Sequence, residues 1–455
     1  MLFVIQFCVA KKLRIFDLKL ALVVYCCSFW DNTRCARLKI MYARSWVVPG
    51  CPVVNFSEGS FMQKKILVAA IAAFAAAPVF ADLTIYGTAD VGYEYIDVGV
   101  DVNGNSLSSS RFTSGVLSTS AFGIKGEQKI DNGLKVGFQL ESGFLFERGL
   151  FTRPSTNVNQ SVAIRGASAV SMWNRISRVY LATKYGEFSF GRQYTPLAYV
   201  DCNLDPVCGG TAFSVDTYWA YPSRMDNSVK FTTSDKRGFV AQVSYSSGDQ
   251  NMTKDDYTDP NKPVSGGVSY GASAQYMVGP TYIGFGYEQH YANSTNLPLF
   301  VRPTKFTGYI FGASYSFGKV KGFASFRNQK ATLYPAGKVE SNGFNRDILT
   351  IGASVLLGRG TFVTNFSFLS DKTDYLALGR LNPGALPNFD SRLFGLAYLY
   401  QLSKDVTVYV SGAKMDNSIN GKANYTIVSG TLTGPFLPKP GNNPSELSVG
   451  LRYNF

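Results

Sequence analysis

The sequence holds few side chains that could perform acid–base or nucleophilic catalysis. His290 is the single histidine among 455 residues, and no Ser or Asp pattern near it would complete a catalytic triad. The chain has neither a CxxC pair nor an HExxH segment, the spacings that commonly hold zinc. The sequence therefore predicts no enzyme activity, no metal site and no cofactor.

Charge and cysteine are concentrated in the first part of the chain. The formal net charge is +13 and there are seven cysteines. Residues 1–81 hold 10 of the 44 Lys and Arg residues and 3 of the 31 Asp and Glu residues, so residues 82–455 carry a net charge of +6. Basic residues in that segment are spread out rather than clustered, so we expect no nucleic-acid partner.

Residues 62–81, MQKKILVAAIAAFAAAPVFA, have the pattern of a secretory signal peptide. Lys64 and Lys65 precede an apolar run that ends in small residues at Ala81, where cleavage is expected. A short buried helix is the alternative reading. We expect Met62 to be the true start and 1–61 to be a mis-annotated extension, since Glu58 and Gly59 require purine-rich codons that could serve as a ribosome-binding site. The mature protein would then be one domain, 82–455.

Hydrophobic and polar residues alternate through most of 82–455. In LKVGFQL, for example, Leu134, Val136 and Phe138 share one face, while Lys135 and Gln139 share the other. A period of two is the signature of a β-strand with one apolar face. The segments with this pattern are 83–98, 117–129, 134–145, 173–184, 187–194, 224–233, 239–247, 267–277, 281–290, 304–316, 319–330, 346–357, 361–370, 391–401, 405–414 and 445–455. They predict an all-β fold with sixteen antiparallel strands.

The lengths of the connections favour a membrane barrel over a half-solvated soluble sheet, which would show the same alternation. Tight turns such as 131–133, 279–280 and 358–360 alternate with long polar connections. Short turns at one end and long loops at the other are typical of outer-membrane barrels, whose closed sheet pairs every backbone group inside the lipid. The polar face of so many strands would line a water-filled channel.

The C-terminus carries the most specific motif. In ELSVGLRYNF, Leu451, Tyr453 and the terminal Phe455 share one face with the preceding aliphatic residues. This ending resembles the signal by which the barrel assembly machinery recognises bacterial outer-membrane proteins. Residues 82–455 as a whole resemble the trimeric general porins of Gram-negative bacteria, nearest the Neisseria/Burkholderia type. The other segments that carry the resemblance are DLTIYGTADVGYEY (82–95), AFGIKGEQKIDNGLKVGFQLE (121–141) and FGRQYTP (190–196).

The resemblance implies a homotrimer of 16-stranded transmembrane β-barrels in the cell outer membrane, in contact with outer-membrane lipid and lipopolysaccharide. It implies short periplasmic turns, long external loops, and a third loop, here 195–222, that folds into the pore. Ions and small hydrophilic solutes would cross by passive diffusion. A weak preference for anions is expected from the net charge of residues 82–455.

The resemblance also implies a constriction with basic side chains on the wall and acidic ones on the loop. The matching wall residues are Arg192 and Arg224, with Arg178 on the preceding strand as a further candidate. One departure is Ala121, where the family often has Arg; Lys125, on the same face, is expected to replace it in part. The acids available on the loop are Asp201, Asp205 and Asp216.

Strand parity supports only some of these positions. Arg178 and Arg224 alternate in step with polar neighbours and should face the lumen, whereas Arg192 has the parity of Phe188 and Phe190. A bulge at Gly191, or the end of the strand, would have to turn Arg192 inward.

Cys202 and Cys208 lie six positions apart on the third loop. An exported protein permits a disulfide between them, and two free thiols are the alternative. Two other functions also stay open: a substrate-specific channel for an anionic nutrient, and a barrel whose long loops, 415–443 above all, act in surface adhesion.

Overall fold

The computed structural model describes residues 83–100, 103–151, 172–208, 214, 218, 223–248, 268–292, 304–333, 341–373, 389–420 and 439–455. All of them belong to the second of two compact units, Val79–Phe455. The expected extension 1–61 and signal peptide 62–81 lie outside the described residues, as does Asp216.

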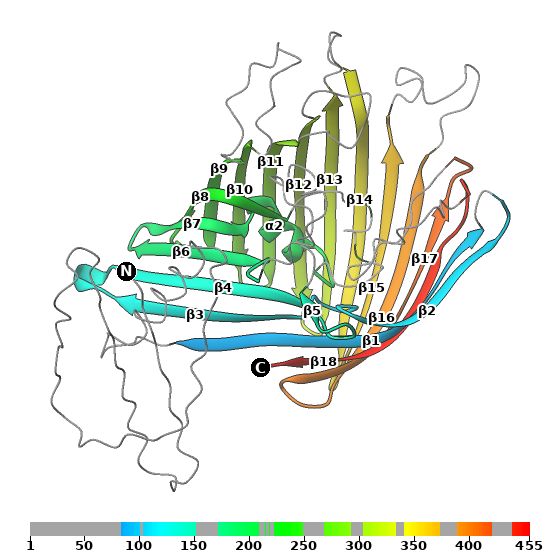
Figure 1. The fold of residues 1–455 in the computed structure, drawn as a ribbon, viewed down its shortest axis with the longest axis horizontal. Helices are drawn as coiled ribbons and strands as arrows, with labels where there is room; N and C mark the ends of the chain where they lie inside the picture. Colours follow the sequence, from blue (N-terminus) through cyan, green and yellow to red (C-terminus); the bar gives the residue numbers. More distant parts are fainter. Residues whose placement is uncertain are drawn as a thin grey trace, which may run out of the picture. The chain divides into compact units, whose positions relative to one another are not determined.

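Eighteen strands, a short 3-10 helix and one α-helix make up the described fold. The strands are β1 (Thr84–Val100), β2 (Ser106–Ser114), β3 (Ala121–Lys129), β4 (Lys135–Leu145), β5 (Leu150–Phe151), β6 (Ile176–Thr183), β7 (Gly186–Tyr194), β8 (Arg224–Thr233), β9 (Phe239–Ser247), β10 (Val268–Val278), β11 (Thr281–Ala292), β12 (Thr304–Phe317), β13 (Val320–Leu333), β14 (Ser341–Leu357), β15 (Gly360–Asp371), β16 (Ser391–Gln401), β17 (Val406–Asn417) and β18 (Ser445–Asn454). The helices are η1 (Asp131–Gly133) and α2 (Pro196–Leu204). Neighbouring strands run antiparallel around one curved sheet (Figure 1).

The sheet closes on itself as a 16-strand barrel. β18 pairs with β1, for example Leu451 with Val91. β2 and β3 lie one after the other along the same edge of β1, since Phe112 pairs with Tyr93 and Ile124 pairs with Ile85. Together they fill the place of one barrel strand. β5 pairs only with the end of β4 and lies outside the wall. The predicted 16-stranded barrel is confirmed.

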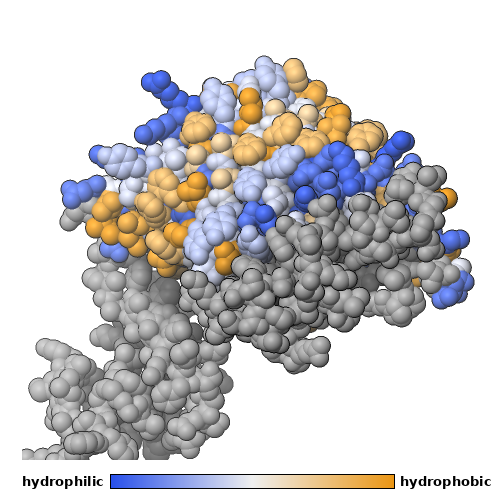
Figure 2. Space-filling model, turned by 90° about the horizontal axis from the view of Figure 1, so that it is seen from above, coloured by the Kyte–Doolittle hydropathy of each residue, from blue (hydrophilic) through white to orange (hydrophobic). Residues whose placement is uncertain are grey.

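Exposure alternates along strands such as β16, as the sequence pattern predicts. On β16 the buried Leu393 and Ala397 alternate with the exposed Phe394 and Tyr398. Exposed aromatic and aliphatic side chains therefore cover the outer face, which must meet lipid. Figure 2 shows one face of the molecule, on which patches of hydrophobic residues lie beside groups of hydrophilic ones.

The connections also follow the prediction. Tight turns join β10 to β11, β12 to β13 and β14 to β15, with Gly279, Gly318 and Gly358 at positive φ. Glycine adopts that backbone conformation without a steric penalty. The long connections all leave the opposite end of the barrel. None of the helices among the described residues is long and apolar enough to cross a membrane.

β2 is the part of the barrel wall that the sequence analysis missed. Its residues, SLSSSRFTS, carry serine on both faces and only Leu107 and Phe112 as large apolar side chains, so no clear alternation exists. Its pairing with β1 supplies the backbone hydrogen bonds that hold it as a strand. Tertiary pairing thus overrides a weak local preference.

Candidate functional site

α2 begins the long connection between β7 and β8 and lies inside the barrel (Figure 1). The Thr195 side chain accepts a hydrogen bond from the Ala198 N–H, and Pro196 occupies the first turn, a favourable start for a helix. The apolar side of α2, Leu197, Val200 and Leu204, is buried against the inner face of β10 to β12. The third loop thus folds into the pore, as the resemblance implied.

Glycines in the wall let the helix approach this closely. A Cβ added to Gly284 would lie 2.8 Å from Val200 Cγ1, and one added to Gly286 would lie 3.0 Å from Leu197 Cα. Both glycines occupy lumen-facing positions of β11. Larger residues there would push α2 toward the open part of the channel.

Asp201 points from α2 into the wall rather than across the lumen. Arg327 on β13 donates to Asp201 Oδ1 from Nε at 2.8 Å and from Nη2 at 2.5 Å. The Arg327 side chain is fully buried and also donates to Ser325 Oγ. A buried ion pair of this kind holds the helix against the wall. The charge of the Asp201 carboxylate is therefore balanced by the Arg327 guanidinium. The carboxylate does not face the cationic wall across the pore.

Asp205, the residue directly after α2, is likewise buried in the protein. Its carboxylate accepts hydrogen bonds from the Ser214 hydroxyl at 2.5 Å and from the Val207 N–H at 2.9 Å. Burial raises the pKa of this carboxyl above its usual range, because a low-dielectric environment disfavours the charged form. The carboxylates of Asp201 and Asp205 thus hold α2 and the turn that follows it. Their expected role on the acidic side of the constriction stays a prediction.

The exposed surface of α2 and the following turn carries no charge. It consists of Tyr199, Cys202, Asn203 and Cys208. The structure joins Cys202 to Cys208 in a disulfide with their Cα atoms 4.3 Å apart. This bridge closes the turn that follows the helix.

The wall facing this surface is basic. Arg175, directly before β6, donates to Glu141 Oε1 on β4 and to the Tyr194 hydroxyl on β7, each at 2.6 Å. Arg224 on β8 donates to the same hydroxyl at 2.6 Å, and its guanidinium stacks 4.4 Å from the Tyr194 ring centroid. One phenol oxygen therefore holds two guanidinium groups side by side.

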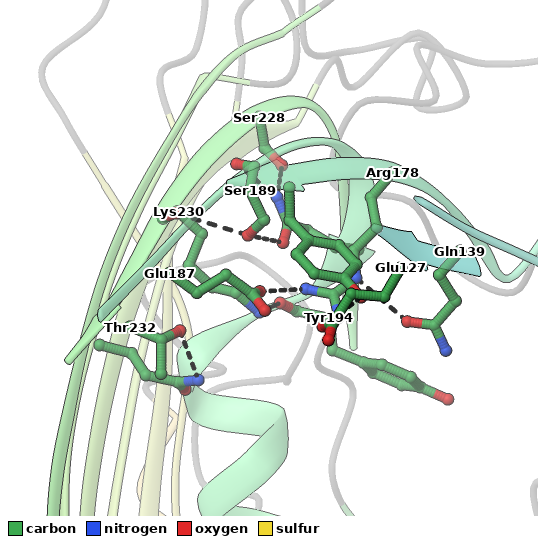
Figure 3. A network of polar contacts seen from close by, with 12 residues as sticks. Glu127, Gln139, Arg178, Glu187, Ser189, Tyr194, Ser228, Lys230 and Thr232 are labelled. Carbon is green, nitrogen blue, oxygen red and sulfur yellow. Dashed lines mark hydrogen bonds and ion pairs between the residues drawn. The ribbon is translucent and has the colours of Figure 1, made fainter. Parts of the chain in front are cut away.

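A second part of the cluster joins the wall to the helix (Figure 3). Arg178 donates to Glu187 at 2.6 Å and to Gln139 at 3.1 Å. The Lys230 ammonium donates to the Tyr194 carbonyl at 3.1 Å and lies 4.5 Å from the ring centroid of Tyr199 on α2. A hollow beside them is lined by Arg178, Glu187, Lys230 and Tyr199, together with Gln242 of β9.

Arg192 reaches its partners through a bulge. The pairing of β7 with β8 shifts register between Gly191 and Gln193, and Gly191 has a φ of +113°. Arg192 then donates to the Asn174 carbonyl at 2.7 Å and to Asp226 at 2.6 Å. The bulge predicted at Gly191 is confirmed.

Lys125 lies on the lumen face of β3, opposite Gln139 on β4. Its ammonium lies 5.5 Å from the centroid of the Tyr86 ring, and the Tyr86 hydroxyl accepts a hydrogen bond from Gln139 at 2.7 Å. Because Arg178 binds the same Gln139, Lys125 belongs to the edge of the basic wall.

Sequence reasoning missed Arg175, Tyr194 and Arg327 as members of the site. Arg327 alternates in step with Ser325 and Gln329, so its parity could have revealed a lumen-facing cation. Arg175 precedes the regular strand, where parity carries no information. Among the described residues, no group of His, Cys, Asp and Glu could hold a metal ion.

The sequence matches a known protein family. The family model described as Gram-negative porin matches residues 67–420. The chain belongs to the Gram-negative porin family. This porin is 25% identical over 391 residues to an outer membrane porin protein of Bordetella pertussis, a match that covers 78% of this chain and 95% of that one. It is 24% identical over 410 residues to outer membrane porin protein 32 of Delftia acidovorans, covering 87% and 100% of the two chains.

Solved structures support the same fold. An anion-selective porin from Comamonas acidovorans matches with a TM-score of 0.63 at 20% identity, over 82% of this chain and 99% of that one. The trimer form of the Vibrio cholerae outer membrane protein OmpT matches with a TM-score of 0.53 at 13% identity, over 82% and 99%. The porin is thus an outer-membrane, multi-pass β-barrel.

Proposed function

We propose that this porin forms a water-filled channel for passive diffusion of ions and small hydrophilic solutes, with a preference for anions. The observation that supports the anion preference is the excess of positive charge on the wall that faces α2. Five cations, Arg175, Arg178, Arg192, Arg224 and Lys230, gather on the wall, while Asp201 and Asp205 are turned into the fold. Among the residues that the structure describes, the exposed surface of α2 carries no carboxylate that could balance the charge of the wall.

The mechanism is electrostatic. Fixed cations on a narrow, low-dielectric-walled passage raise the local concentration of anions and lower that of cations. The carboxylates Glu141, Glu187 and Asp226 pair with some of the guanidinium groups, which moderates the field without reversing it. No conformational cycle or energy source is required. The relative from Comamonas acidovorans, described as anion-selective, is consistent with this proposal.

The test is the reversal potential of a planar bilayer in a potassium chloride gradient. We expect its sign to favour chloride. The double variant Lys125→Gln/Arg178→Gln should lower the anion-to-cation permeability ratio by about twofold or more, since it removes two wall cations and leaves Glu187 without Arg178. The control Lys319→Gln/Lys404→Gln removes equal charge from exposed turns and should change the ratio little. A cation-selective wild-type channel would refute the proposal.

We further propose that the porin works as a homotrimer. The trimer form among the structural relatives supports this. Light scattering of the protein purified in detergent tests it, and the expected mass is three times that of the mature chain. A monomer that retains full conductance would contradict it.

The secretory signal and the C-terminal residues complete the proposal. We infer that cleavage after Ala81 yields the mature chain, and N-terminal sequencing of protein from outer membranes tests this. Leu451, Tyr453 and Phe455 lie exposed on the outer face of the last strand, where the barrel assembly machinery could read them.

A further inference from the structure

Residues 115–120, between β2 and β3, leave the plane of the barrel wall. β2 ends at Ser114, which pairs with Val91 of β1, and β3 begins at Ala121, which pairs with Thr88. Six residues therefore stand opposite a gap of only two residues in β1. The surplus chain cannot continue as a flat strand and must fold to one side of the wall. We call residues 115–120 the inner turn.

The inner turn folds to the lumen side. Val116 and Leu117 are buried in one apolar cluster with Tyr409 of β17. Tyr409 alternates with the exposed Val410 and therefore faces the lumen. A Cβ added to Gly92, on the lumen face of β1, would lie 3.1 Å from Val116 Cγ2. A wall glycine thus makes room for the inner turn, as wall glycines do for α2.

One carboxylate holds the inner turn in this position. Asp90 is fully buried on the lumen face of β1. Its Oδ2 accepts a hydrogen bond from the Ser118 N–H at 2.9 Å. Its Oδ1 accepts one from the Leu117 N–H at 3.4 Å and one from the Tyr409 hydroxyl at 2.7 Å. The Asp90 N–H donates to Ser120 Oγ at 2.9 Å. Hydrogen bonds to an ionised carboxylate are stronger than neutral ones, so Asp90 fixes the backbone of the turn.

The inner turn and α2 lie on opposite sides of the lumen. α2 packs on β10 to β12, whereas the inner turn packs on β1 and β17. The wall between them holds β13 to β16 on one side, and β3, β4 and β6 to β9 on the other. Tyr409 and Gly284 are the fourth residues of β17 and β11, and both strands begin at short turns. Because the strands of a barrel share one tilt, the two seats lie at similar heights.

Neutral hydroxyl residues form the part of the inner turn that solvent reaches. Ser118 and Thr119 are half-buried, while the other residues of the turn are buried. The Ser118 hydroxyl donates to Asp90 Oδ2 at 3.4 Å. The turn therefore presents no charge to the passage, and its effect on a solute is steric. Added bulk at Thr119 would narrow the space in front of α2 and leave the cationic wall as it is.

We propose that the inner turn forms a second side of the constriction, opposite α2, and that the two together set the largest neutral solute that passes. Asp90 is its positioning residue, since it holds the backbone of the turn and is itself buried. The inference rests on the proposed channel function and deepens it. The basic wall selects the sign of the ion, whereas the inner turn limits the width of the pore, which decides the size of solute admitted.

Thiol modification of an open channel tests the position of the inner turn. Residues 82–455 contain no cysteine besides Cys202 and Cys208, which are joined in a disulfide. Thr119→Cys therefore supplies a single reactive thiol. Neutral benzyl methanethiosulfonate, added to this variant in a planar bilayer, should lower the single-channel conductance by about a fifth or more. Ser403→Cys, in the exposed turn before β17, is the control and should keep its conductance. Mass spectrometry verifies that both thiols react.

Asp90→Asn tests the positioning role. The amide replaces one accepting oxygen with an N–H₂ group, so the inner turn should loosen and admit larger solutes. In liposome swelling, the rate for a neutral trisaccharide relative to a monosaccharide should rise about twofold or more. Tyr409→Phe removes only the hydroxyl bond to Asp90 and should shift this ratio in the same direction by less. Asp405→Asn, in the turn before β17, is the control and should keep the wild-type ratio.

The outcomes separate this inference from the channel function. Unchanged conductance after modification of Thr119→Cys, or a thiol there that the reagent cannot reach, would overturn the inner turn as part of the constriction. The wild-type channel would still conduct in the same bilayers, so the proposed channel function would stand. A wild-type swelling ratio in both Asp90→Asn and Tyr409→Phe would overturn the positioning role of Asp90, because loss of stability alone does not change the ratio of two sugars.

Discussion

Tyr194 is the residue on which the cationic wall depends. Its hydroxyl oxygen accepts from both Arg175 and Arg224, and its backbone carbonyl accepts from Lys230. Guanidinium groups this close repel each other, so a shared acceptor and the nearby Glu141 offset part of the repulsion. A single tyrosine therefore sets the spacing of charges along the passage.

Tyr194→Phe removes that shared acceptor and keeps the ring. Two buried guanidinium groups lose a hydrogen bond, so we expect the free energy of unfolding to fall by about 1–3 kcal/mol. Urea unfolding of the detergent-solubilised protein measures the change. Tyr276→Phe is the matched control, because Tyr276 is exposed on the outer face of β10. Equal unfolding midpoints for the Tyr194 variant and the wild type would contradict the role assigned to the hydroxyl.

The sequence predicted the positions of the strand residues of this site but not those of the loop residues. Parity assigned Arg178 and Arg224 to the lumen because both lie within regular strands, and the parity conflict at Arg192 correctly required a bulge. It could not orient Asp201, because the direction of a loop side chain depends on a helix whose seat is formed by distant strands. The burial of Asp205 likewise depends on Ser214, nine residues along the same loop.

α2 is the element that lies against the inner wall of the barrel, and two kinds of contact hold it there. Leu197, Val200 and Leu204 provide an apolar seat, and the ion pair of Asp201 with Arg327 fixes its position along the wall. Removing one member of a buried ion pair leaves an uncompensated charge, which is costlier than removing both.

Arg327→Met should therefore destabilise the protein by about 3–5 kcal/mol. It should also increase current noise in single-channel records, as α2 loses its anchor and moves in the passage. The double variant Asp201→Leu/Arg327→Met removes both charges and should recover a large part of the stability. The same urea titration reads out both proteins. A double variant no more stable than the single one would show that the ion pair has no anchoring role beyond packing.

The disulfide holds the turn after α2, and the helix has its own anchors. Alkylation of the unreduced mature protein should therefore add no label, and alkylation after reduction and unfolding should add two labels per chain. We expect reduction to leave the mean conductance close to its original value. The variant Cys202→Ser/Cys208→Ser controls for labelling elsewhere. Two labels on the unreduced, unfolded protein would exclude the bridge.

The elements themselves were largely predictable. For most spanning strands the apolar face is long enough to give a clear period of two, and the predicted bounds lie within a few residues of the observed ones. The sequence did not predict β2, because serines occupy both of its faces and leave no apolar period of two. Which strand pairs with β18 to close the barrel is a long-range contact that local periodicity does not contain.

At the scale of the whole molecule, closure between the first and last strands is what makes the barrel possible in lipid. An open seam would expose unpaired N–H and C=O groups to hydrocarbon. At this seam the Gly87 N–H donates to the Phe455 carbonyl at 2.9 Å, and the Phe455 N–H donates to the Gly87 carbonyl at 3.0 Å. The terminal residue thus extends the pairing of β18 with β1 to the last position of the chain.

Gly87 is the position where this seam tolerates no side chain. A Cβ there would lie 2.4 Å from the Phe455 ring and 2.8 Å from the Ala121 carbonyl oxygen, and the backbone oxygen cannot move aside easily. Gly87→Ala should therefore lower the free energy of unfolding by about 1–3 kcal/mol and reduce the fraction of protein that resists unfolding in detergent at room temperature.

Gly322→Ala on β13 is the control for this prediction, because a Cβ at that position meets nothing within 4 Å. Alanine loses less conformational entropy than glycine on entering a strand, so the control should be as stable as the wild type or slightly more so. Gel electrophoresis of unheated samples and urea unfolding read out both variants. If Gly87→Ala and Gly322→Ala behave alike, the close approach of Phe455 to Gly87 does not limit closure, and the stability of the seam must come from the strand pairing alone.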